Sequence, residues 1–178
     1  MAITLIYKDT TYGIDKIIKS IQTNLQNKLS WLGAVNIYGK LQRTERESGF
    51  LYEYWTSNRD YTEVFINDKL AGVMGFVVRN PRRINGYYIE ADVDVISTID
   101  LTKIYNNTRR DDERALNELK DILQGSVYVQ QLNEIRENIS NVFSDINTDL
   151  IKYRDMQPYY VFAINLTIKY NEDDCNDR

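Results

Sequence analysis

The chain has 178 residues, of which 43% are hydrophobic and 27% are charged, and its formal net charge is −4. These values are typical of one folded domain with its own core and argue against wholesale disorder. The sequence contains no histidine and one cysteine, Cys175. This excludes serine–histidine triads, cysteine–histidine pairs, histidine zinc sites and internal disulfides. With its negative charge, we do not expect the whole molecule to be drawn to nucleic acid or anionic lipid.

The first predicted element is an amphipathic helix. Its apolar residues recur every three or four positions and therefore share one face; they are Ile14, Ile17, Ile18, Ile21, Leu25 and Leu29. A strand-rich region follows, because residues 35–78 contain β-branched and aromatic residues separated by short polar turns. Its strand candidates are VNIYGKLQR, GFLYEYWT, YTEVFI and KLAGVMGFVVR.

A long hairpin is predicted next. Asn85-Gly86, in RRINGYY, is a strong two-residue turn signal. The stretch YYIEADVDVISTIDL, residues 87–101, leaves this turn and alternates carboxylates with apolar residues, as a strand does. Fully extended, it would span about 50 Å, which is long for a domain of this size. We therefore expect a bend, a bulge at Ile96, or a hairpin that projects from the body.

Helices are predicted after the hairpin. DDERALNELKDIL has acids in its first turn, an apolar face and a following Gly125, so it predicts a helix. The next apolar residues also step by three and four, which predicts a second amphipathic helix lying on the sheet; they are Leu132, Ile135, Ile139, Val142 and Ile146. Finally, YYVFAINLTIKY alternates strictly between apolar and smaller or polar residues and predicts a strand with one buried face.

The order of these elements predicts an α+β fold. We expect an antiparallel twisted sheet with long hairpins, packed by an N-terminal helix and a later helical segment, with the C-terminal strand rejoining the sheet. Residues 1–171 form one domain in this interpretation, and residues 172–178 form an acidic polar tail. The N-terminus lacks the features of a signal peptide, and no run approaches the roughly 20 apolar residues of a membrane helix, so we expect no membrane association.

Two charged groups are candidates for a site. Glu90, Asp92 and Asp94 point the same way from one strand, about 6.5 Å apart, and could hold a divalent ion only with help from other ligands. A solvated or inter-subunit strand face is the favoured interpretation. Arg79, Arg82 and Arg83 lie in RNPRR just before the turn. The chain thus carries both halves of an oligomer interface, in which arginines of one copy meet carboxylates of the next. Phosphate-binding glycine loops are absent.

Four segments together resemble a family: YGIDKIIKSIQTNLQNKL, YIEADVDVISTIDLTKIY, RRDDERALNELKDIL and QPYYVFAINLTIKY. Their order resembles that of neck and connector ring proteins of tailed bacteriophages, in the tail-terminator or head–tail joining class, including those of crAss-like phages. The resemblance covers most of the chain and is one of pattern, since none of these motifs is chemically diagnostic. It implies an α+β protomer with no catalytic residue, metal or cofactor.

The same resemblance implies the surroundings of the protein. It implies a homo-oligomeric ring with sixfold or twelvefold symmetry, bound to neighbouring portal, connector or tail proteins in the virion neck or tail and made in the host cytoplasm. DNA would pass through the lumen without specific binding. Two alternatives remain open: a metal-dependent phosphodiesterase or nuclease that uses Glu90, Asp92 and Asp94, and a small intracellular protein-binding module.

Overall fold

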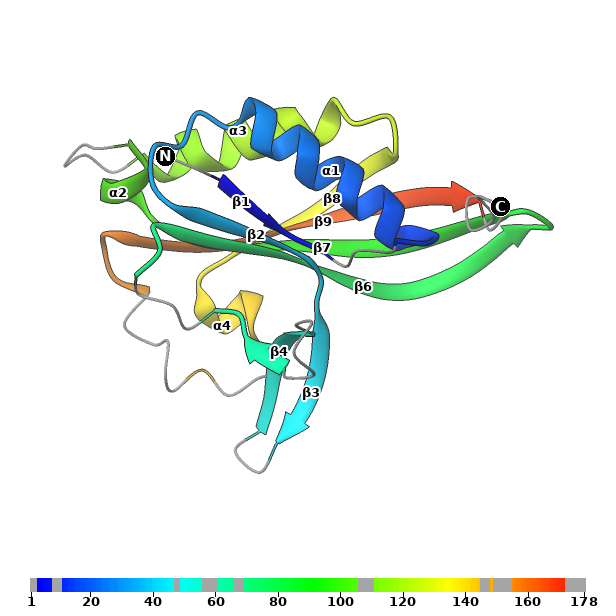
Figure 1. Cartoon of the computed structure of the whole chain (residues 1–178), viewed down its shortest axis with the longest axis horizontal. Helices are drawn as coiled ribbons and strands as arrows, with labels where there is room; N and C mark the ends of the chain where they lie inside the picture. Colours follow the sequence, from blue (N-terminus) through cyan, green and yellow to red (C-terminus); the bar gives the residue numbers. More distant parts are fainter. Residues whose placement is uncertain are drawn as a thin grey trace.

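The fold is built on a six-stranded sheet with the strand order β1-β2-β6-β7-β9-β8 (Figure 1). The structure is a computed structural model of the chain. It describes residues 3–7, 11–46, 49–55, 61–65, 69–105, 111–144, 148 and 155–171. The strands of this sheet are β1 (Ile3–Ile6), β2 (Val35–Lys40), β6 (Gly72–Asn85), β7 (Tyr88–Asp100), β8 (Val129–Glu137) and β9 (Tyr159–Asn171). The predicted α+β class, with a C-terminal strand in the sheet, is confirmed.

The sheet is mixed rather than wholly antiparallel. β1 pairs with β2, and β2 with β6, in parallel, while the other three pairings are antiparallel. The parallel edge arises because the N-terminal helix connects β1 to β2, and a crossover through a helix returns the chain in the same direction. β1 had not been predicted from the sequence.

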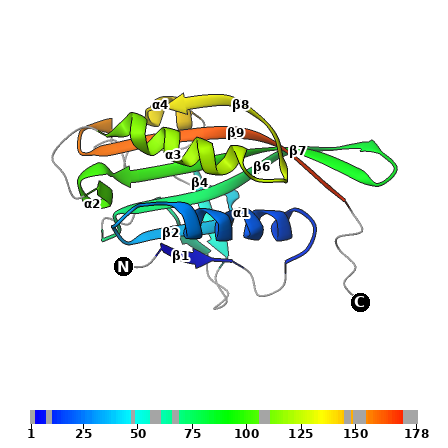
Figure 2. The ribbon, with the colours of Figure 1, turned by 90° about the horizontal axis from the view of Figure 1, so that it is seen from above.

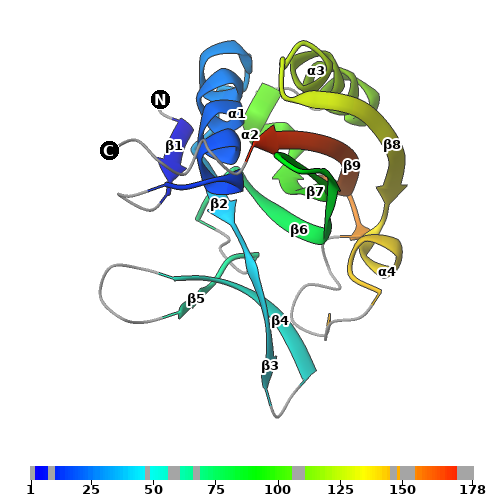
Figure 3. The ribbon, with the colours of Figure 1, turned by 90° about the vertical axis from the view of Figure 1, so that its right-hand side faces the viewer.

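Helices cover one face of the sheet, and a small second sheet lies against the other (Figure 3). The helices on the first face are α1 (Ile14–Lys28), α2 (Leu101–Tyr105) and α3 (Asp112–Gln124); the second face bears α4 (Ile139–Val142) and the strands β3 (Gln42–Arg46), β4 (Gly49–Trp55) and β5 (Tyr61–Glu63). No helix in the described part of the chain has both the length and the apolarity to span a lipid bilayer.

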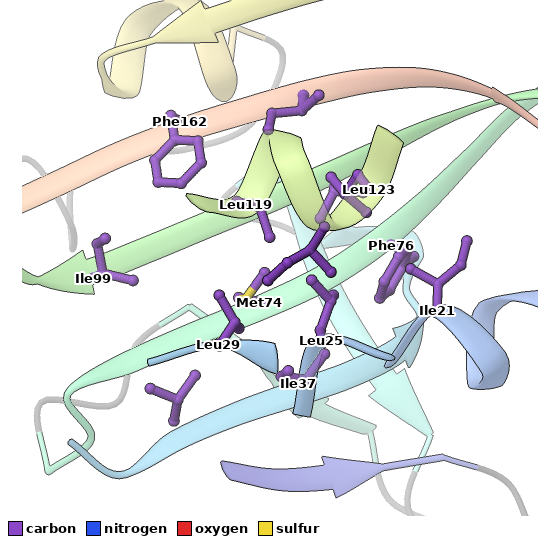
Figure 4. Close-up of a cluster of buried hydrophobic side chains, with 14 of the residues drawn as sticks. Ile21, Leu25, Leu29, Ile37, Met74, Phe76, Ile99, Leu119, Leu123 and Phe162 are labelled. Atoms are coloured by element: carbon purple, nitrogen blue, oxygen red, sulfur yellow. The ribbon is translucent and has the colours of Figure 1, made fainter. Parts of the chain in front are cut away.

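Each face of the large sheet has its own hydrophobic core. The core under the helices contains the predicted apolar face of α1 together with residues of α3, β2, β6 and β9 (Figure 4); it includes Leu25, Ile37, Phe76, Leu123 and Phe162, all fully buried. The core on the second face joins β4 and α4 to the sheet and is more aromatic, with Tyr52, Phe65 and Phe143 in mutual ring contact. Two of the three predicted helices, which the structure places at 14–28 and 112–124, therefore pack as expected.

Glu118 of α3 ties three segments of the helical layer together. One of its carboxylate oxygens accepts a hydrogen bond from the backbone N–H of Ser30, and the other accepts one from the Tyr105 hydroxyl at 3.0 Å. Burial, followed by the charge of Glu118, raises the pKa of Tyr105 well above its ordinary value. The Arg114 guanidinium lies 4.2 Å from the centre of the Tyr105 ring. This cluster fixes the C-terminal end of α1 against α2 and α3.

The predicted helix over residues 132–146 is wrong. Residues 129–137 form strand β8, and among the described residues of this stretch only Ile139–Val142 is helical. Ile146, the last residue of the predicted helix face, lies outside the described residues. Val129, Leu132 and Ile135 face Ile168, Leu166 and Ile164 of β9, so apolar steps of three in β8 match steps of two in β9. Each interval contains a register shift that adds one residue to β8. Two consecutive bulges therefore give a strand the three-residue spacing of a helix face.

The β6–β7 hairpin extends past β2 and β8, as one of the three alternatives for residues 87–101 predicted, while β9 runs beside β7 as far as Tyr88 (Figure 2). β2 pairs with β6 only as far as Phe76, and β8 pairs with β9 only as far as Ile168. β7 pairs with β9 without interruption from Tyr88 to Asp100, so the alternative of a bulge at Ile96 is wrong. We call residues 79–92, flanked by the end of β9, the arm. The expected tail, 172–178, with Cys175, lies outside the described residues.

Candidate functional site: the arm and its charged face

The arm carries its charged residues mainly on the sheet face opposite α1 and α3. Alternation along β7 places Glu90, Asp92 and Asp94 on the same face as Ile96, which belongs to the core beneath α4 and β4. The predicted common direction of the three carboxylates follows from this register. The remaining question is what each carboxylate contacts.

Asp94 is buried, with only 1% of its side chain exposed, and both of its oxygens are engaged. Oδ2 accepts hydrogen bonds from Arg79 Nε at 2.8 Å and pairs with Arg136 Nη2 at 2.7 Å. Oδ1 accepts a hydrogen bond from Asn165 Nδ2 at 2.7 Å. A carboxylate held by two guanidinium groups and an amide has its charge balanced in place.

The Asp94 cluster fastens the base of the arm to the body. Arg79 comes from β6 and also donates a hydrogen bond from Nη2 to the Tyr52 hydroxyl of β4 at 3.2 Å. Arg136 comes from β8 and Asn165 from β9. One carboxylate thus joins four strands of the large sheet, and through Arg79 the small sheet as well. This arrangement restrains the angle between the arm and the two sheets.

A bulge in β6 places both Arg79 and Arg82 on the charged face. Arg79 is paired with Asp92 and Arg82 with Glu90, so three residues of β6 span the length of two in β7. Asn80, within this irregular stretch, has a positive φ of 46°. Without the extra residue, Arg82 would lie on the opposite face. Instead its Nε and Nη2 donate to Glu90 Oε2 at 3.0 and 2.8 Å.

The structure brings the two predicted charged groups together, but within one chain. Arg79 pairs with Asp94 and Arg82 with Glu90, whereas Arg83 is paired in the ladder with Ile89 and lies on the other face. Asp92 is half-buried beside the Arg79 position. That these residues also contact a second copy stays a prediction.

Two residues of this cluster were missed from the sequence. Arg136 was placed in a helix, because the spacing of Leu132 and Ile135 hid the bulged strand. Asn165 was assigned to the polar side of the last strand, and its alignment with Asp94 depends on the pairing of β7 with β9. The alternation of both strands was visible, but the register between them was not.

The described residues offer no group of three or more carboxylate or cysteine side chains placed to hold a metal ion. In particular, Asp94 already has two cationic partners, which would repel a divalent ion at the same oxygens. The chemistry of this face is therefore that of ion pairing and hydrogen bonding between strands.

The end of the arm is apolar and exposed. Ile84, Tyr87 and Tyr88 are all exposed large side chains, and Tyr87 reaches 68% exposure. Gly86 and Tyr87 form the turn, one residue later than the predicted Asn85-Gly86 centre, and Asn85 pairs with Tyr88. The Lys169 Nζ lies 4.2 Å from the centre of the Tyr88 ring. The arm thus combines a charged base with exposed large side chains at its turn.

Comparison with protein-family models, with curated proteins and with solved structures finds no match for this chain. The function proposed below therefore depends on the geometry of the chain itself and on the resemblance in pattern given above.

Proposed function

We propose that this protein is a non-enzymatic structural subunit that assembles with copies of itself into a closed ring. By the resemblance in pattern, the ring belongs to the head–tail neck of a tailed phage, where it joins the portal to the tail and lets DNA pass. The observation that carries the assembly part of this proposal is the arm. It extends beyond the body of the protein and presents Ile84, Tyr87 and Tyr88 to solvent.

The arm is built to keep its shape. β7 has 13 residues, corresponding to a strand of about 40 Å, and it is paired along its whole length with β9. The Asp94 cluster holds its base, and the Arg82–Glu90 pair bridges its two strands. A pre-organised contact element loses little conformational entropy when it binds, so it favours stable association.

Ring formation requires contacts between two different surfaces of the same chain, because a contact between identical surfaces closes as a dimer. An arm that reaches away from the body suits the first type, since its end meets a different part of the neighbour. The resemblance supplies the virion setting and the neighbouring portal, connector or tail proteins as partners.

The alternative of a metal-dependent nuclease lacks comparable support. It uses Glu90, Asp92 and Asp94 as ligands, but Asp94 is held by two arginines and Glu90 by a third. A nuclease would bind Mg²⁺ or Mn²⁺ and lose its activity in Asp92→Ala. The second alternative, a small binding module, predicts a stable monomer that uses the tyrosine-rich end of the arm for another protein.

The mass of the purified protein in solution tests the proposal. Native mass spectrometry across a concentration series should give one closed oligomer that dominates over intermediate sizes, as cooperative ring closure requires. A chain that remains monomeric at every concentration up to its solubility limit would contradict self-assembly and favour the binding module. Tight binding of Mn²⁺ together with cleavage of a nucleic acid would instead support the nuclease.

A further inference from the structure

We propose that an open cavity between α1 and the turn that joins α3 to β8 is a binding site for a neutral sugar. The cavity has a volume of about 420 Å³, within the range of about 300–1,000 Å³ that is usual for small-molecule sites. It lies on the helical side of the large sheet, where α1 and α3 run side by side (Figure 2). The inference goes beyond the proposed ring and does not depend on it.

One wall of the cavity is a polar stripe along α1. Its residues recur every three or four positions and therefore share one side of the helix; they are Ser20, Thr23, Asn24 and Asn27. Another side of the same helix is packed in the hydrophobic core, and the Glu118 cluster fixes its C-terminal end against α3. The stripe is thus carried by an element that the body holds in place.

The other wall is the turn that follows α3. It contributes Gly125, Ser126, Val127 and Tyr128. Backbone hydrogen bonds fix its shape, because the Ser126 N–H donates to the Leu123 carbonyl at 3.1 Å and the Val129 N–H donates to the Ser126 carbonyl at 3.2 Å. Both walls are therefore formed before a ligand arrives, which lowers the entropic cost of binding.

The cavity contains hydrogen-bonding groups that the chain itself leaves unused. The Thr23 hydroxyl donates to the Lys19 carbonyl at 2.9 Å and Asn24 Nδ2 donates to the Ile122 carbonyl at 3.5 Å, so each side chain keeps an acceptor oxygen. Within the described part of the chain, no hydrogen bond is made by four further side chains of the lining, those of Ser20, Asn27, Ser126 and Tyr128. Donors and acceptors are thus both available to a ligand.

The absence of charge decides the class of ligand. None of the eight described residues that line the cavity is charged, although 27% of the residues in the chain are. A phosphate or carboxylate ligand would therefore find no cationic side chain in the lining to balance it. Hydroxyl groups of a sugar both donate and accept hydrogen bonds, and the amides and hydroxyls of the lining match them in both roles.

An apolar part of the lining completes the match. Val127 is 90% exposed and Tyr128 is half-buried at the turn. A sugar ring has polar hydroxyls at its rim and C–H groups on its faces, so aliphatic and aromatic side chains cover a face while polar groups bind the rim. A neutral solute without such a face, such as urea, would leave this part of the lining unused.

Saturation-transfer difference NMR on the full-length protein tests the site, because it detects the signals of the sugar and suits a monomer and a large ring alike. The probes are the methyl glycosides of glucose, galactose, mannose and N-acetylglucosamine, with glucuronic acid as a charged comparison. At least one neutral sugar should give a signal that saturates with concentration. An open cavity covers only part of a sugar, so we expect a dissociation constant in the millimolar range.

Two variants assign the signal to the cavity. The double substitution Asn27→Ala and Ser126→Ala removes one hydrogen-bonding side chain from each wall and should weaken binding by about tenfold. Lys28→Ala is the matched control, since Lys28 is also exposed on α1 but does not line the cavity. It should change the dissociation constant by less than about twofold.

A saturating signal that weakens in the double variant and persists in Lys28→Ala supports the site. The site is overturned if none of the four neutral sugars gives a saturating signal, or if the double variant binds as tightly as the wild type. Tighter binding of glucuronic acid than of every neutral sugar overturns it as well. The mass of the protein in solution does not enter these results, so ring assembly stands or falls separately.

Discussion

Replacement of Asp94 by asparagine tests whether the charged cluster at the base of the arm stabilises the chain. The substitution keeps the volume of the side chain and the oxygen that faces Asn165. It removes the negative charge that holds Arg79 and Arg136 at 2.8 and 2.7 Å. Two guanidinium groups then face each other and an amide, with no carboxylate between them.

The expected cost follows from burial. Removing one partner of a buried ion pair costs about 3–5 kcal/mol, because the other partner remains buried and uncompensated. Here the Arg79 and Arg136 side chains are 35% and 20% exposed, so water can relieve part of the penalty. We therefore expect Asp94→Asn to lower the free energy of unfolding by about 3 kcal/mol, at the low end of that range.

Urea unfolding measures this difference, provided that the free energy of unfolding depends on urea concentration with the same slope in wild type and variant. Asp92→Asn is the matched control, since Asp92 lies two residues away on the same face and is half-buried. We expect the control to lose less than about 1 kcal/mol. Equal losses in the two variants would refute the reasoning, because the cluster would then contribute no more than an ordinary carboxylate of this face.

Three further substitutions test the packing of the body. Glu118→Ala should lower the free energy of unfolding by about 1–3 kcal/mol in urea titrations, whereas Glu113→Ala, on the exposed side of the same helix, should have little effect. Gly33→Ala should lower the free energy of unfolding by about 1–3 kcal/mol, because its new Cβ would lie 2.2 Å from the Cβ of the buried Ala71. The Cβ added by the control Gly86→Ala would meet no atom within 4 Å. Equal thermal midpoints for the two variants would contradict this reasoning. The pKa of Tyr105 is raised on folding, so the folded state binds its proton more tightly and stability should fall above a pH of about 10. Tyr105→Phe should therefore give a shallower loss of thermal stability between pH of about 10 and 12 than the wild type, and parallel curves would argue against it.

Local periodicity predicted the elements that have one buried face and regular geometry. The helix from Ile14 to Lys28 and the strand from Tyr159 to Asn171 each show an uninterrupted period, and both lie where the sequence predicts. The presence of a hairpin turn was also predictable from Asn85-Gly86, although the turn lies one residue later, at Gly86 and Tyr87. Its projection could be offered only as one of three alternatives, since it depends on where the flanking strands end.

Bulges explain what the sequence could not reveal. In β8, two added residues convert an alternating pattern into steps of three, so Val129, Leu132 and Ile135 imitate a helix. In β6, one added residue brings Arg79 and Arg82 to the same face although they are three positions apart. A bulge changes which face each later residue occupies, and its position is set by the partner strand rather than by the local sequence.

The candidate site was accessible from the sequence only in part. The common face of Glu90, Asp92 and Asp94 follows from strand alternation, but the favoured interpretation of a solvated or inter-subunit face is wrong for Asp94, which is buried within the chain. The assignment of Asp94 to arginines from β6 and β8 required the strand order, in which β7 lies between β6 and β9. Residues far apart in the chain meet there through tertiary pairing alone.

Electron microscopy of the purified protein tests the central claim of ring assembly most directly. Negatively stained particles at high concentration should show annular views of one size with a single rotational symmetry. The double variant Ile84→Ser and Tyr87→Ser should give small particles of single-chain size under the same conditions. Wild-type particles of single-chain size at every concentration, or open filaments without closed rings, would contradict the account.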